Sequence, residues 1–201
     1  MKQFDWETFY TFTKDSPPWP LLVRAVSLLT HKGRALDLGA GAGRDTLYLL
    51  QQGFRVTSVD SDPHAVAILS SFPQENLQVV EASFEDFAFE TYDLINAQFA
   101  LPFLSQRRFR EVFERVTRAI RPGGIFVGQF FGIHDQWNTP EHDMTFLTRG
   151  QAEAVLQDMD IIEFNEVDMD GHVADGSPKH WHTFHIIARR KPILQWPYSG
   201  Y

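Results

Sequence analysis

The sequence predicts an α/β fold in which a mostly parallel sheet carries helices on both of its faces. Short apolar runs of strand length alternate with segments of helical periodicity from Arg34 onward, and this alternation is typical of parallel sheets. A glycine-rich turn at Gly39–Gly43 joins the first strand to the following helix. The last two strand-like segments have no helix between them, so we expect an antiparallel pair at one edge of the sheet.

Seven segments are predicted to be strands, because each is a short apolar or β-branched run bounded by turn residues. In chain order they cover residues 35–38, 55–59, 77–80, 92–97, 125–131, 161–169 and 181–188. The sheet is therefore expected to contain seven strands, of which the last is antiparallel to the others.

The predicted helices are marked by residues that favour helix ends. Pro20 suits the first turn of an entry helix, and Gly53 ends the helix after the glycine-rich turn. Asp62 is a helix cap, and Thr148 with Gln151 matches a capping box. The helices are expected over residues 20–29, 44–52, 109–120 and 148–159, with one more beginning at 62. Residues 121–124, Arg-Pro-Gly-Gly, should end a helix and turn the chain into the next strand.

A chain of 201 residues suits one domain that buries its own core. We divide residues 1–201 into an aromatic segment and helix at 1–32, a core at 33–190 and a tail at 191–201. The chain has no cysteine, which excludes thiol catalysis, disulfides and cysteine metal sites.

The charge and the ends of the chain exclude several classes of partner. The formal net charge is -8, whereas a surface that follows phosphates needs clustered Lys and Arg, so we expect no nucleic-acid partner. The start of the chain lacks an apolar run typical of a signal peptide, and no stretch has the length of a membrane-spanning helix. We expect a cytoplasmic protein, and the sequence leaves its oligomeric state open.

The chemistry is expected at the glycine-rich turn. Glycines at positions 39, 41 and 43 allow a tight turn and let a ligand approach the backbone. The helix behind the turn presents N–H groups that favour an anionic group of the ligand. The spacing G-x-G-x-G differs from the dinucleotide fingerprint G-x-G-x-x-G, because Arg44 stands where the third glycine would be. A nicotinamide enzyme is therefore disfavoured.

Asp60 is the next acid at a strand end, at 60 − 39 = 21 residues beyond the first glycine. A carboxylate at this distance commonly binds ribose hydroxyl groups. The alternative is a helix cap, but Asp62 already fills that role. We therefore assign Asp60 to the ribose.

Together these motifs resemble the class I S-adenosylmethionine-dependent methyltransferases. The resemblance is carried by D-L-G-A-G-A-G-R-D at 37–45, V-D at 59–60, Y-D-L-I-N-A at 92–97 and R-P-G-G at 121–124. It implies a Rossmann-like, doubly wound sheet, S-adenosylmethionine as the cofactor and methyl transfer as the activity. The G-R-D start of the first helix and the short chain further resemble small bacterial methyltransferases of the tellurite-resistance-protein-like group.

The resemblance also implies a set of cofactor contacts. Asp37 and the glycine-rich backbone would hold the methionine end, Asp60 the ribose, and Gln98 the methionyl part. Ser83 stands where the family often has an acid beside the adenine, so only a hydroxyl is offered there, and Phe84 would pack on the ring or in the core. The expected cofactor residues are Asp37, Gly39, Ala40, Gly41, Gly43, Arg44, Asp60, Ser61, Ser83, Phe84 and Gln98.

The acceptor side is expected to be aromatic. The N-terminal aromatic residues either pack as core or form a lid that excludes water and surrounds the sulfonium. A small, partly apolar acceptor would suit such a rim, although an oxyanion remains open. The candidate acceptor residues are Trp6, Tyr10, Trp19, Phe131, His134 and Trp137.

No catalytic base is assigned, because one is needed only if the acceptor must lose a proton. His134 and His182 are the candidates for that role. His180 and His182 share one face of the last strand and His185 lies on the other, so we expect no metal site. A non-catalytic S-adenosylmethionine-binding or protein-interaction module and a nicotinamide-dependent oxidoreductase are the alternative functions.

Overall fold

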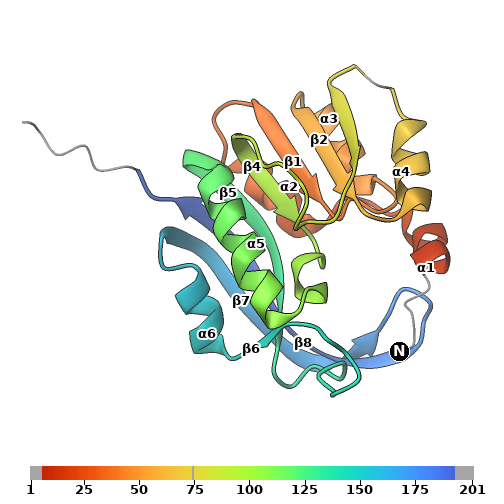
Figure 1. Cartoon of the computed structure of the whole chain (residues 1–201), viewed down its shortest axis with the longest axis vertical. Coiled ribbons are helices and arrows are strands. Elements are labelled where there is room, and N and C mark those ends of the chain that lie inside the picture. The colour runs from red at the N-terminus through yellow and green to blue at the C-terminus, as the bar shows by residue number, and fades with distance from the viewer. Residues whose placement is uncertain (1–5, 74, 193–201) are drawn as a thin grey trace, which may run out of the picture.

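A mixed sheet forms the centre of the molecule (Figure 1). The structure is a computed structural model that describes residues 6–73 and 75–192. Its strands are β1 (Arg34–Leu38), β2 (Arg55–Asp60), β3 (Leu77–Glu81), β4 (Tyr92–Ala97), β5 (Ile120–Gly132), β6 (Phe146–Leu147), β7 (Met159–His172) and β8 (Pro178–Arg190).

The strands follow the order β3-β2-β1-β4-β5-β8-β7 along the sheet. The first five in this order are parallel, whereas β8 runs antiparallel to both β5 and β7. This confirms the predicted Rossmann-like sheet, with its antiparallel last strand and its antiparallel pair at one edge. The sequence did not predict the two-residue β6, which pairs with β5 beside this path.

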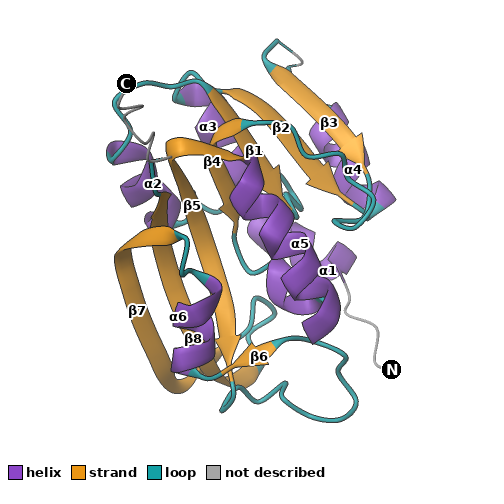
Figure 2. Ribbon diagram, turned by 60° about the vertical axis from the view of Figure 1, so that its left-hand side comes forward, coloured by secondary structure: helices purple, strands orange, loops and turns teal. Residues whose placement is uncertain are grey.

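Helices cover both faces of the sheet, as predicted (Figure 2). They are α1 (Trp6–Thr13), α2 (Pro20–Ser27), α3 (Arg44–Gln51), α4 (Pro63–Ser70), α5 (Gln106–Ala119) and α6 (Arg149–Val155), with a 3₁₀ turn η1 (Leu101–Phe103). Buried side chains of α5 and α6 form one hydrophobic cluster with the sheet, and those of α2 and α3 form another. The sheet therefore lies between two apolar layers. Both of its faces are covered, so a ligand is expected at the carboxyl ends of the strands.

The local signals for helix ends act as predicted. The Asp62 carboxylate accepts the backbone N–H of His64, and Pro63 occupies the first turn of α4. Thr148 and Gln151 form both bonds of the capping box at α6. Each bond satisfies an N–H group that the helix itself leaves unpaired.

Several predicted boundaries were wrong. Residues 121–124 lie within β5, which begins at Ile120, and do not separate it from α5. The register between β4 and β5 shifts between Tyr92 and Leu94, and Gly123 has φ 82°. Residues 121–124 therefore form a bulge within the strand in place of the predicted turn. At the next boundary, α6 ends at Val155 and β7 begins at Met159. The aromatic N-terminal segment also contains a helix, α1, that the sequence analysis did not identify.

The far end of the β7–β8 hairpin curls toward α1 (Figure 1). Both elements reach the carboxyl ends of the parallel strands, where β1 and β4 are neighbours. The chain changes direction across the sheet between these two strands, and ligands of open α/β sheets bind at such a point. Among residues 6–73 and 75–192, no helix is both long and apolar enough to cross a membrane. The predicted tail lies largely outside the described residues.

We predict that Gly43→Ala destabilises the fold more than Gly53→Ala. Both glycines have positive φ, 80° and 86°, which costs an alanine about 1–2 kcal/mol. A Cβ on Gly43 would also meet Phe72 and lie 2.8 Å from Leu69 Cδ2, whereas one on Gly53 meets nothing within 4 Å. Urea unfolding should show losses of about 2–4 kcal/mol at position 43 and about 1–2 kcal/mol at position 53. Equal losses would contradict the packing that we describe.

Candidate functional site

A cavity of about 1200 Å³ opens at the carboxyl end of the sheet. It exceeds the roughly 300–1,000 Å³ of a pocket for one drug-sized molecule, so it has room for a cofactor and a second ligand. One end is lined by the glycine-rich turn and the ends of β1 and β2. The other is lined by aromatic residues from α1, the segment after β4, the loop after β5 and the β7–β8 hairpin.

The glycine-rich turn is tight enough to require glycine. Gly39 and Gly41 have φ values of 68° and 52°, in the left-handed region that side chains disfavour. A Cβ on Gly39 would lie 2.7 Å from Ala100 Cβ, and one on Gly41 would lie 3.2 Å from Tyr10 Cε1. Gly39 N–H bonds the Val59 carbonyl at 2.8 Å. The turn therefore brings bare backbone to the cavity wall.

A buried hydrogen-bond network holds the end of β1 against β4 and α3. Asn96 Nδ2 donates to Asp37 Oδ1 at 2.8 Å and to Asp45 Oδ2 at 3.2 Å. The Thr46 hydroxyl donates to Asp37 Oδ2 at 2.6 Å, and Trp19 N–H donates to Asp45 Oδ1 at 3.0 Å. Asp37 and Asp45 are only 2% and 5% exposed, so two carboxyl groups share one amide donor away from water.

Burial makes the ionisation of these carboxyl groups unfavourable. Burial, followed by the charge of Asp45, raises the pKa of Asp37 to about 7. Burial also raises the pKa of Asp45 and of Asp60. Arg44 is the one arginine or lysine among the described residues that line the cavity, and its guanidinium lies 4.4 Å from the centre of the Trp19 ring. A positively charged ligand would therefore be stabilised at this end.

Asp60 joins the glycine-rich turn to the start of α4. Its carboxylate accepts Gly41 N–H at 2.9 Å and Asp62 N–H at 3.0 Å. Tyr10 of α1 donates to the Asp62 carboxylate at 3.3 Å, so α1 closes over the same corner. Two backbone donors orient Asp60 beside the cavity that it lines.

Most of the predicted cofactor residues gather around the cavity, and two do not line it. Ala40, Arg44, Ser61, Phe84 and Gln98 line it, together with Asp37, Gly39, Gly41 and Asp60. Gly43 does not, because it serves as the left-handed cap of α3 beneath the turn. Ser83 also lies outside, since its hydroxyl donates to Asp86 Oδ2 at 2.7 Å within a local turn. The geometry gives no support to an adenine contact by Ser83.

Phe99 lies at the centre of the aromatic end. Its φ of 49° is left-handed, an unusual and strained conformation for an aromatic residue. Its N–H donates to Gln129 Oε1 at 2.9 Å, which fixes the backbone. The ring centre lies 5.0 Å from that of Trp19 and 5.7 Å from that of Trp181. The predicted acceptor residues Trp6, Tyr10, Trp19, Phe131 and Trp137 line the same cavity.

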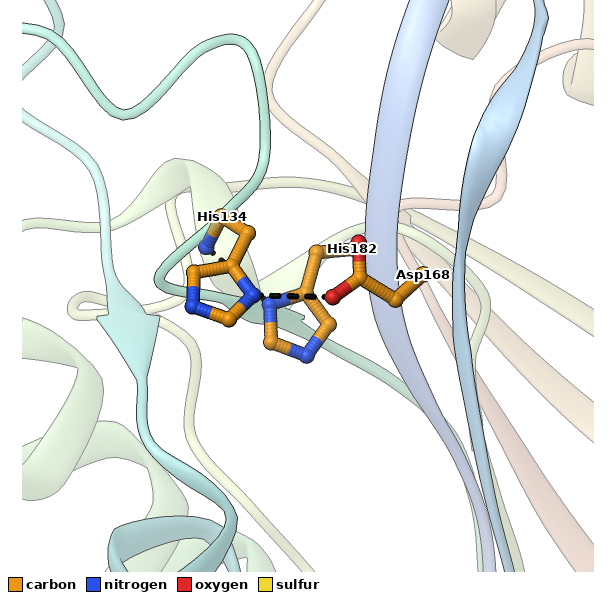
Figure 3. Close-up of side chains that lie close together, drawn as sticks. All are labelled: His134, Asp168 and His182. Carbon is orange, nitrogen blue, oxygen red and sulfur yellow. Dashed lines mark hydrogen bonds and ion pairs between the residues drawn. The ribbon is translucent and has the colours of Figure 1, made fainter.

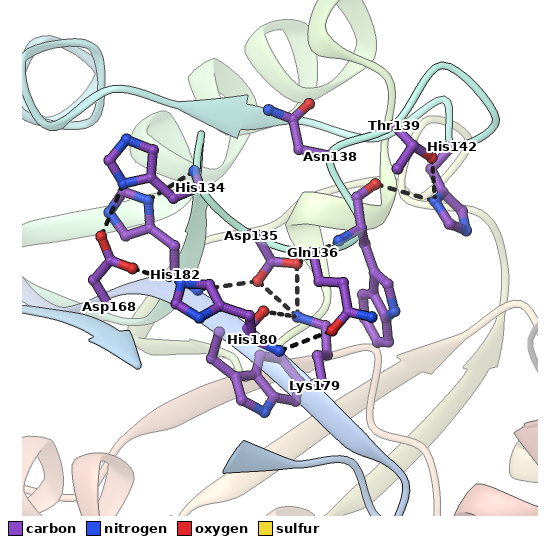
Figure 4. Close-up of polar contacts among 12 residues, drawn as sticks. His134, Asp135, Gln136, Asn138, Thr139, His142, Asp168, Lys179, His180 and His182 are labelled. Carbon is purple, nitrogen blue, oxygen red and sulfur yellow. Dashed lines mark hydrogen bonds and ion pairs between the residues drawn. The ribbon is translucent and has the colours of Figure 1, made fainter. Parts of the chain in front are cut away.

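A buried ammonium group supports this aromatic wall (Figure 4). Lys179 is 3% exposed and bonds both carboxylate oxygens of Asp135, at 2.6 and 2.7 Å. Its Nζ lies 3.5 Å from the centre of the Trp181 ring and 4.2 Å from that of Trp137. The ion pair therefore joins the loop after β5 to β8 and fixes two indole rings from behind.

The predicted bases His134 and His182 belong to another polar group (Figure 3). His134 Nδ1 lies 2.8 Å from Asp168 Oδ2, and His134 N–H donates to His182 Nδ1 at 3.0 Å. His182 Nε2 bonds Glu166 at 2.9 Å. Neither histidine lines the cavity, so the geometry does not support a catalytic role for them.

The atoms of His134, Asp168 and His182 that could bind a metal lie within 4.8 Å of one another. Because His182 Nδ1 accepts a backbone N–H and its Nε2 bonds Glu166, both of its nitrogens already have partners. A metal would have to displace one of these partners. The absence of a metal remains a prediction.

His185 also lines the cavity, although no sequence pattern marked it as a candidate site residue. It lies there with Trp181 and Thr183, and its Nε2 lies 3.1 Å from Thr183 Oγ1. Strand alternation correctly placed His185 opposite His180 and His182, but it did not say which face meets the cavity. Asp45 and Asn96 were also missed as partners of Asp37, because their network crosses three elements.

A profile of the methyltransferase domain matches residues 35–124. This range holds β1 through the first residues of β5 and therefore contains the glycine-rich turn, Asp60 and the buried network. Residues 35–124 are thus similar to the methyltransferase domain family. The predicted resemblance to class I methyltransferases is thereby confirmed, and the family supports S-adenosylmethionine as the cofactor.

Known relatives agree with this assignment. The chain is 27% identical over 137 residues to the probable S-adenosyl-L-methionine-dependent methyltransferase TehB of Haemophilus influenzae, covering 66% of this chain and 48% of TehB. It thus spans about half the length of that relative. The solved structure of H. influenzae TehB has a TM-score of 0.72 and 22% identity, covering 85% of this chain and 61% of that one.

A second solved structure shares the fold. It is the 1,6-didemethyltoxoflavin-N1-methyltransferase of Burkholderia thailandensis, with bound 1,6-didemethyltoxoflavin and S-adenosylhomocysteine. Its TM-score is 0.70 at 21% identity, and the match covers 93% of this chain and 86% of that one. The likeness at this identity shows the common fold.

We predict that Asp37→Asn stabilises the ligand-free protein at alkaline pH. Asp37 has a raised pKa in the folded state, so its contribution to stability is lost as pH rises from about 4 through about 7. The neutral amide removes this loss. The unfolding temperature should rise by about 2–4 °C at pH 8, or about 1 kcal/mol for a chain of this size, and change little at pH 4.5.

Asp93→Asn is the matched control, because the Asp93 carboxylate accepts Arg34 N–H at 2.7 Å and pairs with Arg121 at 3.1 Å. Its loss should destabilise the protein at pH 8. A fall in stability for both variants at pH 8 would contradict the charge state that we assign to Asp37.

Proposed function

We propose that this protein transfers the methyl group of S-adenosylmethionine to a small-molecule acceptor. The observation that carries the proposal is the set of buried carboxyl groups, Asp37, Asp45 and Asp60, beside a bare glycine-rich turn. S-Adenosylmethionine brings an ammonium and a sulfonium charge to such a site, so it offsets the cost of burying carboxylates. The match of residues 35–124 to the methyltransferase domain supports the same cofactor.

The charges of the site disfavour one alternative function, and the lining of the cavity disfavours the other. The pyrophosphate of a nicotinamide cofactor is anionic and would meet the three buried carboxyl groups, which is an unfavourable arrangement. A non-catalytic binding module would keep the cofactor end. It would have no need of a further end lined by aromatic rings, and this cavity has one. Methyl transfer is therefore the better supported function.

The acceptor is proposed to be small because the aromatic end of the cavity lies between two elements of the fold. It is bounded by α1 on one side and by the β7–β8 hairpin on the other, and the net charge of -8 does not favour a nucleic acid. The B. thailandensis neighbour was solved with bound 1,6-didemethyltoxoflavin and S-adenosylhomocysteine, which supports a small-molecule acceptor here.

The residues of this chain act by binding, alignment and exclusion of water. When bound, S-adenosylmethionine supplies a methyl group on an already activated sulfur. The glycine-rich backbone and Asp37 would hold its methionine end, Asp60 its ribose, and Phe84 its adenine. Tyr10 of α1 closes the corner above Gly41, and the aromatic end aligns the acceptor. Proximity and orientation of this kind account for much of the rate of such a transfer.

We predict that Asp60→Ala weakens the binding of S-adenosylhomocysteine by about 1–3 kcal/mol, because charge-assisted bonds to the ribose are lost. Isothermal titration calorimetry on the folded variant measures this change. Asp86→Ala is the control, since it removes an acid from the turn after β3, outside the cavity. Unchanged affinity in Asp60→Ala would remove Asp60 from the site.

The function itself is tested by turnover. The protein should release S-adenosylhomocysteine from S-adenosylmethionine with at least one member of a panel of small aromatic, amine and oxyanion acceptors. Calorimetry with NAD should detect no binding. Binding of NAD without binding of S-adenosylmethionine would overturn the proposal.

A further inference from the structure

The aromatic end of the cavity carries one imidazole whose surroundings differ from those of the other histidines. His185 is partly buried between β5 and β7, where its neighbours in register are Gln129 and Asn165. The ring lies edge-to-face with Phe99, with 6.2 Å between the ring centres, and Nε2 reaches Thr183 Oγ1 at 3.1 Å. None of these four neighbours carries a charge, and burial lowers the pKa of His185 below its usual value.

Flat aromatic surfaces surround this imidazole. Phe99 contacts His185, Trp19, Phe131 and Trp181 through ring pairs whose centres are 5.0–6.2 Å apart. Phe99 is held there in a left-handed conformation, and strain of this kind is retained where the surroundings enforce it. The rings therefore form a preorganised slot, and stacking against them favours a planar ligand.

The ammonium of Lys179 gives this slot an electrostatic preference. Lys179 lies against Trp181 and Trp137 but does not line the cavity, so its charge is on the protein side of the rings. The Asp135 carboxylate balances this charge, but the ammonium lies against the indole faces and weakens the attraction that they would offer to a second cation. The wall therefore favours a neutral, electron-rich ring over a cationic one.

We propose, on the basis of the function proposed above, that the acceptor is a planar aromatic or heteroaromatic molecule with an acidic N–H or O–H, and that His185 accepts its proton. With Nε2–H donating to the Thr183 hydroxyl, Nδ1 of His185 carries the free lone pair. This assigns His185 as a catalytic residue in place of His134 and His182.

The step balances without a further reactant. The acceptor's N–H or O–H bond breaks, its proton goes to Nδ1 of His185, and the electron pair stays on the acceptor atom. That pair forms the new bond to the methyl carbon, while the bond from this carbon to sulfur breaks and leaves its pair on sulfur. The sulfonium becomes a neutral thioether, and the imidazolium returns its proton to water.

The experiment uses 7-hydroxycoumarin as the probe, because it is planar, has an acidic O–H and absorbs at a different wavelength when ionised. The full-length protein is first titrated with S-adenosylhomocysteine by calorimetry and then, saturated with it, with the probe at constant pH. Quenching of tryptophan fluorescence reports binding, and the absorbance of the ionised form reports proton transfer. 7-Methoxycoumarin, which has no proton to lose, is the ligand control.

The wild-type protein should bind both coumarins and raise the ionised fraction of bound 7-hydroxycoumarin above its value in buffer at the same pH. His185→Gln should bind the probe within about threefold of wild type but lose the added ionisation. Phe99→Leu should bind it about fivefold more weakly, because the contact between the Phe99 ring and the ring of the probe is lost. His180→Gln is the matched control on the opposite face of β8 and should behave as wild type. Circular dichroism and thermal unfolding verify that each variant folds.

Each result decides one part of the proposal. If neither coumarin quenches the tryptophan fluorescence of the wild-type protein, the proposal of an aromatic slot is overturned. An unchanged ionised fraction in His185→Gln, or an equal loss in His180→Gln, would overturn the role of His185. The calorimetric titration separates these outcomes from a failure of the proposed function, because the slot can bind the probe even if S-adenosylhomocysteine does not bind.

Discussion

The hydrogen bonds from one amide group, that of Asn96, to Asp37 and Asp45 are the interaction on which the site depends. They bring the end of β1, the end of β4 and the first turn of α3 to one point, where the chain changes direction across the sheet. The glycine-rich turn lies between two of these elements and is therefore fixed by the same network. Because the two carboxyl groups are buried together, the ligand-free site is electrostatically unfavourable, and a cationic ligand would relieve that cost.

The alternation of side chains along β8 divides two polar systems that are close in sequence. Thr183 and His185 face the cavity, whereas His182 faces away and joins His134, Glu166 and Asp168. The outer group connects the loop after β5 to the β7–β8 hairpin. The hairpin and that loop also carry aromatic residues of the acceptor end, so the outer group braces the wall without touching its contents.

The aromatic end of the cavity is built from rings that are held from outside the cavity. Gln129 holds the strained backbone of Phe99, and Lys179 with Asp135 holds the indoles of Trp137 and Trp181. A buried ion pair contributes little net stability on average. Here the ion pair lies behind two rings that line the cavity, so it fixes the orientation of those rings. It thereby affects which ligands fit against the wall.

The sequence by itself determined the fold class, the helix caps and the glycine-rich end of the cavity. These features are local: the glycine-rich turn occupies five consecutive residues, and Asp60 follows at the end of the next strand. The tertiary structure alone decided the aromatic end of the cavity, because its residues come from α1, the segment after β4, the loop after β5 and the β7–β8 hairpin. Alternation along β8 separates His182 from His185 in the sequence, but only packing against the neighbouring strands and helices determines which of the two meets the cavity.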